Sequence, residues 1–208
     1  MRVVVDSDNS RDLRQSELRR HLQTMSRFIG GAKQGSSLTM ILRSAGSDPA
    51  KALIGMKGAL QRAGASARVI LARLEPEDEL RQLFACLSEL APQEAASELI
   101  RWMRNPRLLD AHEQVTYGEA ICWSGDAMRR DADKRNALAL FDENAPDAVR
   151  LGRLAFEALW AVSAPVPERR LSGPAAARPS GAYELTSEAP VSVSPLCPGP
   201  EGWPLIRH

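Results

Sequence analysis

Residues 37–72 read SLTMILRSAGSDPAKALIGMKGALQRAGASARVILA, and this stretch decides the expected fold. The apolar run 37–43 is bounded by Gly, Ser and Ala, as is typical of a buried strand. Asp48, followed by a proline, favours the start of a helix that continues to about Ala63. A second apolar run at 67–72 predicts another strand. A strand, a helix and a strand in this order predict two parallel neighbours joined by a right-handed crossover.

The rest of the chain up to residue 163 supplies further elements by its apolar spacing and its turn residues. These are helices at 11–29, 75–90 and 92–103, a hairpin over 113–122 with Gly118 at the turn, a strand at 136–141, and a helix from 144 onward. The last helix is expected to bury Val149, Leu151, Leu154, Phe156, Leu159 and Trp160. Together these elements predict an α/β fold with a mixed sheet flanked by helices.

The composition divides the chain into three parts. Residues 1–14 form an N-terminal arm, which the sequence leaves open as either a strand or a loose segment. Residues 15–163 form the domain. Residues 164–208 are rich in Pro, Ser, Gly and Ala, which predicts a disordered tail because such a segment buries little apolar surface. At its end, Trp203, Leu205 and Ile206 are either an anchor for a protein partner or an ordinary frayed terminus.

Composition also excludes several classes of protein. The net charge of +1 gives no overall field that attracts nucleic acid. Three cysteines without C-x-x-C spacing and three histidines indicate neither a disulfide framework nor a metal site, and no cofactor motif occurs. The N-terminus lacks a signal-like apolar region, and no apolar stretch approaches the length of a membrane span. We therefore expect a cytoplasmic protein that does not span a membrane.

Residues 112–136 are the most informative stretch for function, and they read HEQVTYGEAICWSGDAMRRDADKRN. Their order and spacing resemble the phospholipase D superfamily in its short single-motif form. That family is characterised by His-x-Lys, four residues and then Asp, followed by Gly-Ser-x-Asn and an Asn-led strand. The strand-helix-strand start and the helix around Phe156 and Trp160 also resemble the family, so the resemblance covers roughly residues 15–163.

The resemblance assigns roles to individual positions of this chain. His112 takes the place of the catalytic histidine, Gln114 that of the lysine and Glu119 that of the aspartate. The Gly-Ser-x-Asn place falls on the stretch around Ser124, and Asn136 begins a strand like the family's Asn-led strand. Arg129, Arg130 or Lys134 are candidates to supply the missing positive charge from elsewhere. In the family, the histidine attacks phosphorus and a second histidine protonates the leaving oxygen. Gln114 carries no charge, and phosphoryl transfer depends on fixed positive charge.

Three functions follow as alternatives. The first is a non-catalytic phospholipase-D-like binding or scaffold module, in which His112 is a capping or hydrogen-bonding residue. The second is a phosphodiesterase or phosphatidyl transferase that works as a homodimer, because one motif supplies one histidine. The third is a nucleic-acid-binding accessory protein that uses the basic cluster 129–135. Asp126, Asp131 and Asp133 weaken the field of this cluster, and such a cluster is usually a solvated face. Phospholipid is a further potential ligand.

Tyr117, Cys122 and Trp123 are expected to pack in the core of the hairpin.

Overall fold

The structure is a computed structural model, and it describes residues 7–129 and 140–172. In the first helix, side chains are described from residue 16 onward. The helices are α1 (Ser7–Gly31), α2 (Asp48–Gly55), α3 (Lys57–Arg62), α4 (Glu77–Leu90), α5 (Ala96–Leu99), the 3₁₀ helix η1 (Pro106–Asp110), α6 (Pro146–Val162) and α7 (Glu168–Leu171). The strands are β1 (Ser37–Leu42), β2 (Ser66–Leu71), β3 (Ile100–Trp102), β4 (His112–Tyr117), β5 (Ile121–Ala127), β6 (Leu140–Asp142) and β7 (Ala164–Pro165).

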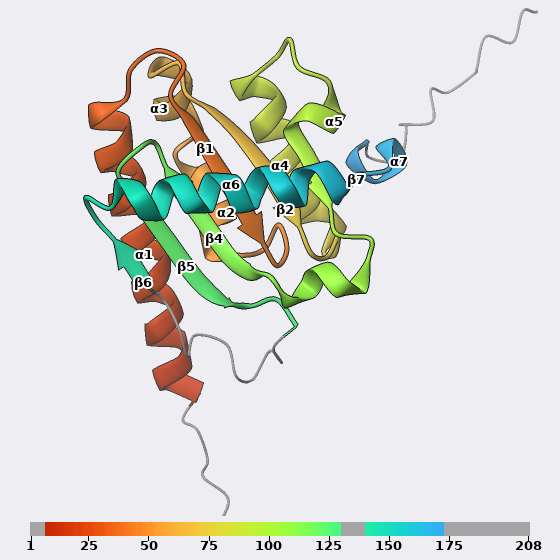
Figure 1. The fold of residues 1–208 in the computed structure, drawn as a ribbon, viewed down its shortest axis with the longest axis horizontal. Coiled ribbons are helices and arrows are strands. Elements are labelled where there is room, and N and C mark those ends of the chain that lie inside the picture. Colours follow the sequence, from red (N-terminus) through yellow and green to blue (C-terminus); the bar gives the residue numbers. More distant parts are fainter. Residues whose placement is uncertain (1–6, 130–139, 173–208) are drawn as a thin grey trace, which may run out of the picture. The chain divides into compact units, whose positions relative to one another are not determined.

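The seven strands form one mixed sheet in the order β6-β5-β4-β1-β2-β3-β7 (Figure 1). β1, β2 and β3 are parallel, and every other neighbouring pair is antiparallel. The predicted mixed α/β sheet with flanking helices is confirmed. The predicted parallel pair is also confirmed, with Ser37 opposite Ser66 and Leu42 opposite Leu71. The helix between these strands is divided into α2 and α3 at Met56.

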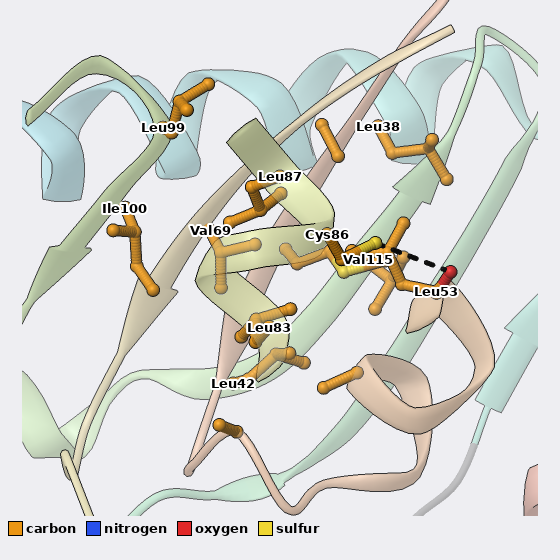
Figure 2. Close-up of a cluster of buried hydrophobic side chains, with 14 of the residues drawn as sticks. Leu38, Leu42, Leu53, Val69, Leu83, Cys86, Leu87, Leu99, Ile100 and Val115 are labelled. Atoms are coloured by element: carbon orange, nitrogen blue, oxygen red, sulfur yellow. Dashed lines mark hydrogen bonds between the residues drawn. The ribbon is translucent and has the colours of Figure 1, made fainter. Parts of the chain in front are cut away.

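Helices α1, α2 and α4 cover one face of the sheet, and α6 lies across the other face at the front of Figure 1. The first face holds the larger core cluster. Figure 2 shows how Leu83 and Leu87 of α4 pack against Val69 of β2 and Leu42 of β1. The same view shows the thiol of Cys86 directed at the Leu53 carbonyl oxygen, with the two atoms 3.9 Å apart. In this layer, the crossover helices α2 and α4 pack on the parallel strands that they connect.

The second face is narrower and more polar. Phe156 and Trp160 of α6 stack with ring centroids 5.3 Å apart and pack on Ile41 and Ile70. Below α6, the hydroxyl oxygens of Thr39 on β1 and Thr116 on β4 lie 2.6 Å apart. At the edge of this face, the Arg101 guanidinium lies 4.8 Å from the Trp160 ring centroid, which is a cation–π contact. Arg101 also donates to the Trp160 carbonyl oxygen.

The predicted hairpin is confirmed, with Gly118 at a positive φ of 62° in its turn. Tyr117, Cys122 and Trp123 are buried as predicted. The predicted strand at 136–141 corresponds in part to β6, and residues 136–139 lie outside the described residues.

The prediction of a helix at 92–103 is wrong. The chain forms only the short helix α5 there and then enters β3, which pairs with β2. Ile100 is fully buried and extended, with φ −144° and ψ 130°. Completing the parallel sheet therefore outweighs the local helical preference of this segment.

The predicted domain limits also need correction. α1 begins at Ser7, inside the expected N-terminal arm of residues 1–14. At the other end, β7 and α7 belong to the domain although they lie within the expected tail of residues 164–208. β7 pairs with β3, and Leu171 of α7 is buried in the larger core cluster. The rest of the predicted tail, from residue 173, lies outside the described residues.

Two of the residues expected in the core of the last helix are exposed instead. Leu151 and Leu154 are 60% and 59% exposed, whereas Phe156 and Trp160 are buried. The apolar periodicity predicted the helix correctly, but only one side of α6 packs on the sheet. The leucines on its other side are exposed, so α6 has apolar residues on both sides.

Among the described residues, no helix is both long enough and apolar enough to cross a membrane.

Candidate functional site

His112 is the first residue of β4, at the end of the hairpin where β1 also ends. Its side chain is exposed, and its Nδ1 lies 2.9 Å from the carbonyl oxygen of Gly125 on β5. Because a carbonyl oxygen only accepts hydrogen bonds, Nδ1 carries the proton in this contact. Nε2 is then the basic nitrogen of the neutral ring. The backbone of β5 thus fixes both the orientation and the tautomer of His112.

Gln114 lies beneath α6. Its amide nitrogen is 3.7 Å from the Cys122 sulfur, and Ser124 is its register partner on β5. α6 approaches closely because residue 152 is a glycine: a Cβ atom there would lie 2.9 Å from the Gln114 amide nitrogen. Position 114 therefore holds a neutral side chain packed against a helix.

A buried ion pair occupies the same end of the hairpin as His112. The Arg43 guanidinium lies 3.5 Å from a carboxylate oxygen of Glu113, and the two side chains are 4% and 14% exposed. The other Glu113 oxygen accepts from the Arg43 backbone N–H at 2.9 Å and from the Ser47 hydroxyl at 3.2 Å. Arg43 also donates to the carbonyl oxygen of Ala127, the register partner of His112. Its positive charge is therefore already balanced by Glu113.

Further carboxylates surround this ion pair. Burial raises the pKa of Glu17 on α1 to about 7, and the charges of Asp48, Glu113 and Asp126 raise it further in the same direction. Burial lowers the pKa of His21, one turn further along α1, to about 3, so this ring stays neutral. The local field beside the Arg43–Glu113 pair is therefore negative, which disfavours a phosphate group.

Glu119 lies at the opposite end of the hairpin, in the turn after Gly118. β4 runs for six residues between His112 and this turn, a length of about 20 Å. Within one chain, the structure therefore does not bring Glu119 to His112. Glu119 instead lines a cleft of about 630 Å³ between the hairpin turn and the end of α1. Arg153 borders this cleft and donates to the Gly118 carbonyl oxygen at 2.7 Å.

The remaining predicted phosphate-binding residues are distributed differently. Ser124 and Gln114 are brought together as register partners. Arg129 is exposed and committed to local structure, with its Nε 3.1 Å from Asp110 and an Nη donating to the Pro106 carbonyl oxygen at 3.1 Å. Arg130 and Asn136 lie outside the described residues, as do Trp203, Leu205 and Ile206 of the predicted docking segment.

The described cysteines are poorly suited to nucleophilic chemistry. Cys86 and Cys122 are both free and buried. Burial raises the pKa of Cys86 to about 11 and also raises that of Cys122, so the thiolate forms are disfavoured. Across residues 7–129 and 140–172, no group of three or more His, Cys, Asp or Glu side chains is arranged to hold a metal ion.

Sequence reasoning missed the pair of Arg43 and Glu113. The two residues are 70 positions apart, so no local spacing connects them. The available signal was the charge itself: Arg43 directly follows an apolar strand, and Glu113 lies beside the start of another strand. Charged residues in such positions are usually paired.

A scan of the chain against protein-family models finds no match, and a search of curated proteins finds no match either. Function therefore has to be inferred from the residues of this chain.

Proposed function

We propose that the domain is a non-catalytic phospholipase-D-like binding or scaffold module. The single observation that carries this proposal is the environment of Gln114. The side chain in the lysine position is uncharged, lies beneath α6 and packs against Gly152. A phosphoryl group that reached His112 would meet no lysine at position 114, so the charge that stabilises phosphoryl transfer is missing there.

The neighbouring cation does not replace the lysine. Arg43 is almost fully buried and is bound to Glu113 and to the Ala127 backbone. Releasing its guanidinium for a ligand would leave the Glu113 carboxylate partly buried without its partner, which is strongly unfavourable. This pair supports a structural role for the motif region. In the proposal, the domain is a rigid scaffold, and the segment with Trp203, Leu205 and Ile206 docks to a protein partner.

A phosphodiesterase assay tests the proposal. The full chain and a His112→Ala variant would be incubated with a chromogenic phosphodiester, with single-stranded DNA and with phosphatidylcholine vesicles. We expect equal background rates for both proteins on all three substrates. Turnover by the wild-type chain that disappears in His112→Ala would overturn the proposal. An Asn105→Ala variant, which changes a helix cap outside the motif, controls for general effects of substitution.

The geometry of His112 favours one alternative, a phosphodiesterase or phosphatidyl transferase. The ring is exposed, and its Nδ1 contact leaves Nε2 as a nucleophilic nitrogen. In this alternative, Nε2 attacks phosphorus and the bond to the leaving oxygen breaks. A second His112 from another copy then protonates that oxygen. Detection of phosphohistidine at residue 112 after incubation with substrate would support this alternative over the first.

We also propose that the protein resides in the cytoplasm. The thiols of Cys86 and Cys122 are both free and buried in the fold. Reduced cysteines are maintained in the cytosol, whereas oxidising compartments favour disulfides. Fractionation of cells that express the full chain would test this location, and recovery in a secreted fraction would contradict it.

A further inference from the structure

The outward side of α6 is an apolar stripe. Leu151, Leu154 and Val162 are 60%, 59% and 61% exposed, and Ala155 and Ala158 between them are also exposed. These positions recur at the spacing of one helix face, and the opposite side of the helix packs on the sheet. The stripe extends over most of α6, which is about 25 Å long. We refer to these five residues as the α6 stripe.

We propose that the α6 stripe is the interface of a homodimer in which two copies of α6 pack antiparallel about a two-fold axis. Side-chain size along the stripe fits this arrangement. Leu151 and Leu154 come first along it, Ala155 and Ala158 follow, and Val162 lies beyond them at the end of the helix. An antiparallel partner centred between Leu154 and Ala155 places these two leucines beside the two alanines of the other copy. A parallel pair would place leucine against leucine and alanine against alanine.

The charges beside the stripe are self-complementary in the same arrangement. Arg150 and Glu157 are seven residues apart, so they lie on the same flank of α6, and both line a shallow groove of about 390 Å³ that includes Leu154. In an antiparallel pair with Leu154 near the axis, Arg150 of each copy faces Glu157 of the other. In a parallel pair, this flank would face the opposite flank of the partner helix, so Arg150 and Glu157 would not meet across the interface.

The contacts that Arg150 and Glu157 make within one chain leave both side chains able to pair across the interface. Arg150 contacts Asp147 at 3.5 Å, and both side chains are well exposed, so this pair contributes little to stability. Glu157 contacts Arg68 of β2 and remains 53% exposed. A carboxylate accepts more than one hydrogen bond, so Glu157 keeps Arg68 while it receives Arg150 from the partner copy.

The interface is small, as in transient complexes. A stable complex usually buries about 800 Å² on each partner, and one helix face provides less than this. We therefore expect a dissociation constant in the micromolar range. The stripe points away from the sheet, so dimerisation through α6 is independent of whether His112 reacts.

Sedimentation velocity of the full chain from about 1 to about 200 μM tests the proposal. We expect a reversible monomer–dimer equilibrium. Leu154→Asp places two carboxylates near the axis and should raise the dissociation constant at least about 100-fold. Leu140→Asp is the matched control, because Leu140 is 51% exposed on β6 and lies outside the stripe, and it should leave the equilibrium unchanged. Circular dichroism and thermal unfolding would verify that both variants are folded.

A charge exchange tests the antiparallel arrangement itself. Arg150→Glu and Glu157→Arg should each weaken self-association about 10-fold, because each creates two like-charged contacts across the axis. When the two variants are mixed, one opposite-charge pair forms on each side, so the mixture should associate to within about 3-fold of the wild-type chain.

Three outcomes would overturn the proposal. The first is a chain that stays monomeric at the highest concentration, whatever else the stripe binds. The second is a dimer that Leu154→Asp does not weaken, because that dimer uses another surface. The third is a mixture of the two charge variants that associates no better than each variant alone.

Discussion

The helices on the two faces of the sheet differ in how they use their apolar residues. α4, on the first face, buries Leu80, Leu83 and Leu87 and turns charged residues such as Glu77 and Glu89 to solvent. α6, on the second face, buries Phe156 and Trp160 but also exposes the α6 stripe. The apolar residues of α4 are explained by folding alone. Those of α6 exceed what the sheet covers, which indicates a second role for this helix.

The largest expected effect concerns the inward side of α4. Leu83 is fully buried in the larger core cluster, so Leu83→Ala removes packed methyl groups and leaves a cavity. We expect the free energy of unfolding to fall by about 3 kcal/mol. Urea denaturation followed by circular dichroism would measure this change. A loss below about 1 kcal/mol would show that the first face is packed more loosely than the structure indicates.

The second prediction concerns the polar layer beneath α6. Thr116→Val preserves the shape of the side chain but leaves the Thr39 hydroxyl buried without its partner. We expect a loss of about 1–2 kcal/mol in the free energy of unfolding. The double variant Thr39→Val with Thr116→Val removes both hydroxyls and should recover most of that loss. Equal losses for the single and double variants would contradict a direct hydroxyl pair.

A third prediction tests the charged part of the first face through pH. The Glu17 carboxyl has a pKa of about 7 in the folded chain, above its usual value of 4.5. The folded state therefore binds the proton more tightly than the unfolded state. This contribution to stability is fully present below about pH 4.5 and is lost as the pH rises to about 7.

Glu17→Gln should therefore make the chain more stable than the wild type at pH 8, by about 1–2 kcal/mol, with a smaller difference at pH 5. This magnitude is below that of the full pKa shift because the side chain retains some contact with water. The lowered pKa of His21 reduces the stability of the fold only as the pH falls below 6.5, so the comparison at pH 8 is independent of it. Thermal unfolding at the two pH values measures the difference, and the exposed Glu94→Gln is the control for the charge change.

The smallest expected effect is on the outward side of α6. Leu154→Gln should change the free energy of unfolding by no more than about 0.5 kcal/mol when the chain is monomeric, because Leu154 is 59% exposed. Denaturation at a chain concentration well below the dimer dissociation constant measures it. A loss as large as that of Leu83→Ala would remove the contrast between the two helices.

The sequence predicted those parts of the fold that depend on local patterns. The crossover between β1 and β2 followed from two apolar runs and a capped helix, and the hairpin followed from alternation around Gly118. β3 was missed because its three residues are extended by pairing with β2, a contact that the local sequence does not encode. The exposure of Leu151 and Leu154 was missed because helical periodicity locates an apolar side without showing whether another element covers it.

The candidate site was predictable only in part. The position of His112 at a strand start and of Gly118 at the turn followed from the sequence pattern. The salt bridge between Arg43 and Glu113 did not, because strand order decides which charged residues meet. The separation of Glu119 from His112 follows from the length of β4, which spacing in the sequence alone does not convert into distance.

The glycine at position 152 also limits how this chain can change. The Gln114 amide and the Thr116 methyl group already lie where a side chain on Gly152 would be, so there is no room for a larger residue at position 152. A lysine at position 114 would be one atom longer than glutamine and would bring an ammonium group into this half-buried position, which is costly without a counter-charge. A longer side chain at position 114 therefore requires α6 to shift as well. Substitutions at this strand position and on the helix above it are thus coupled.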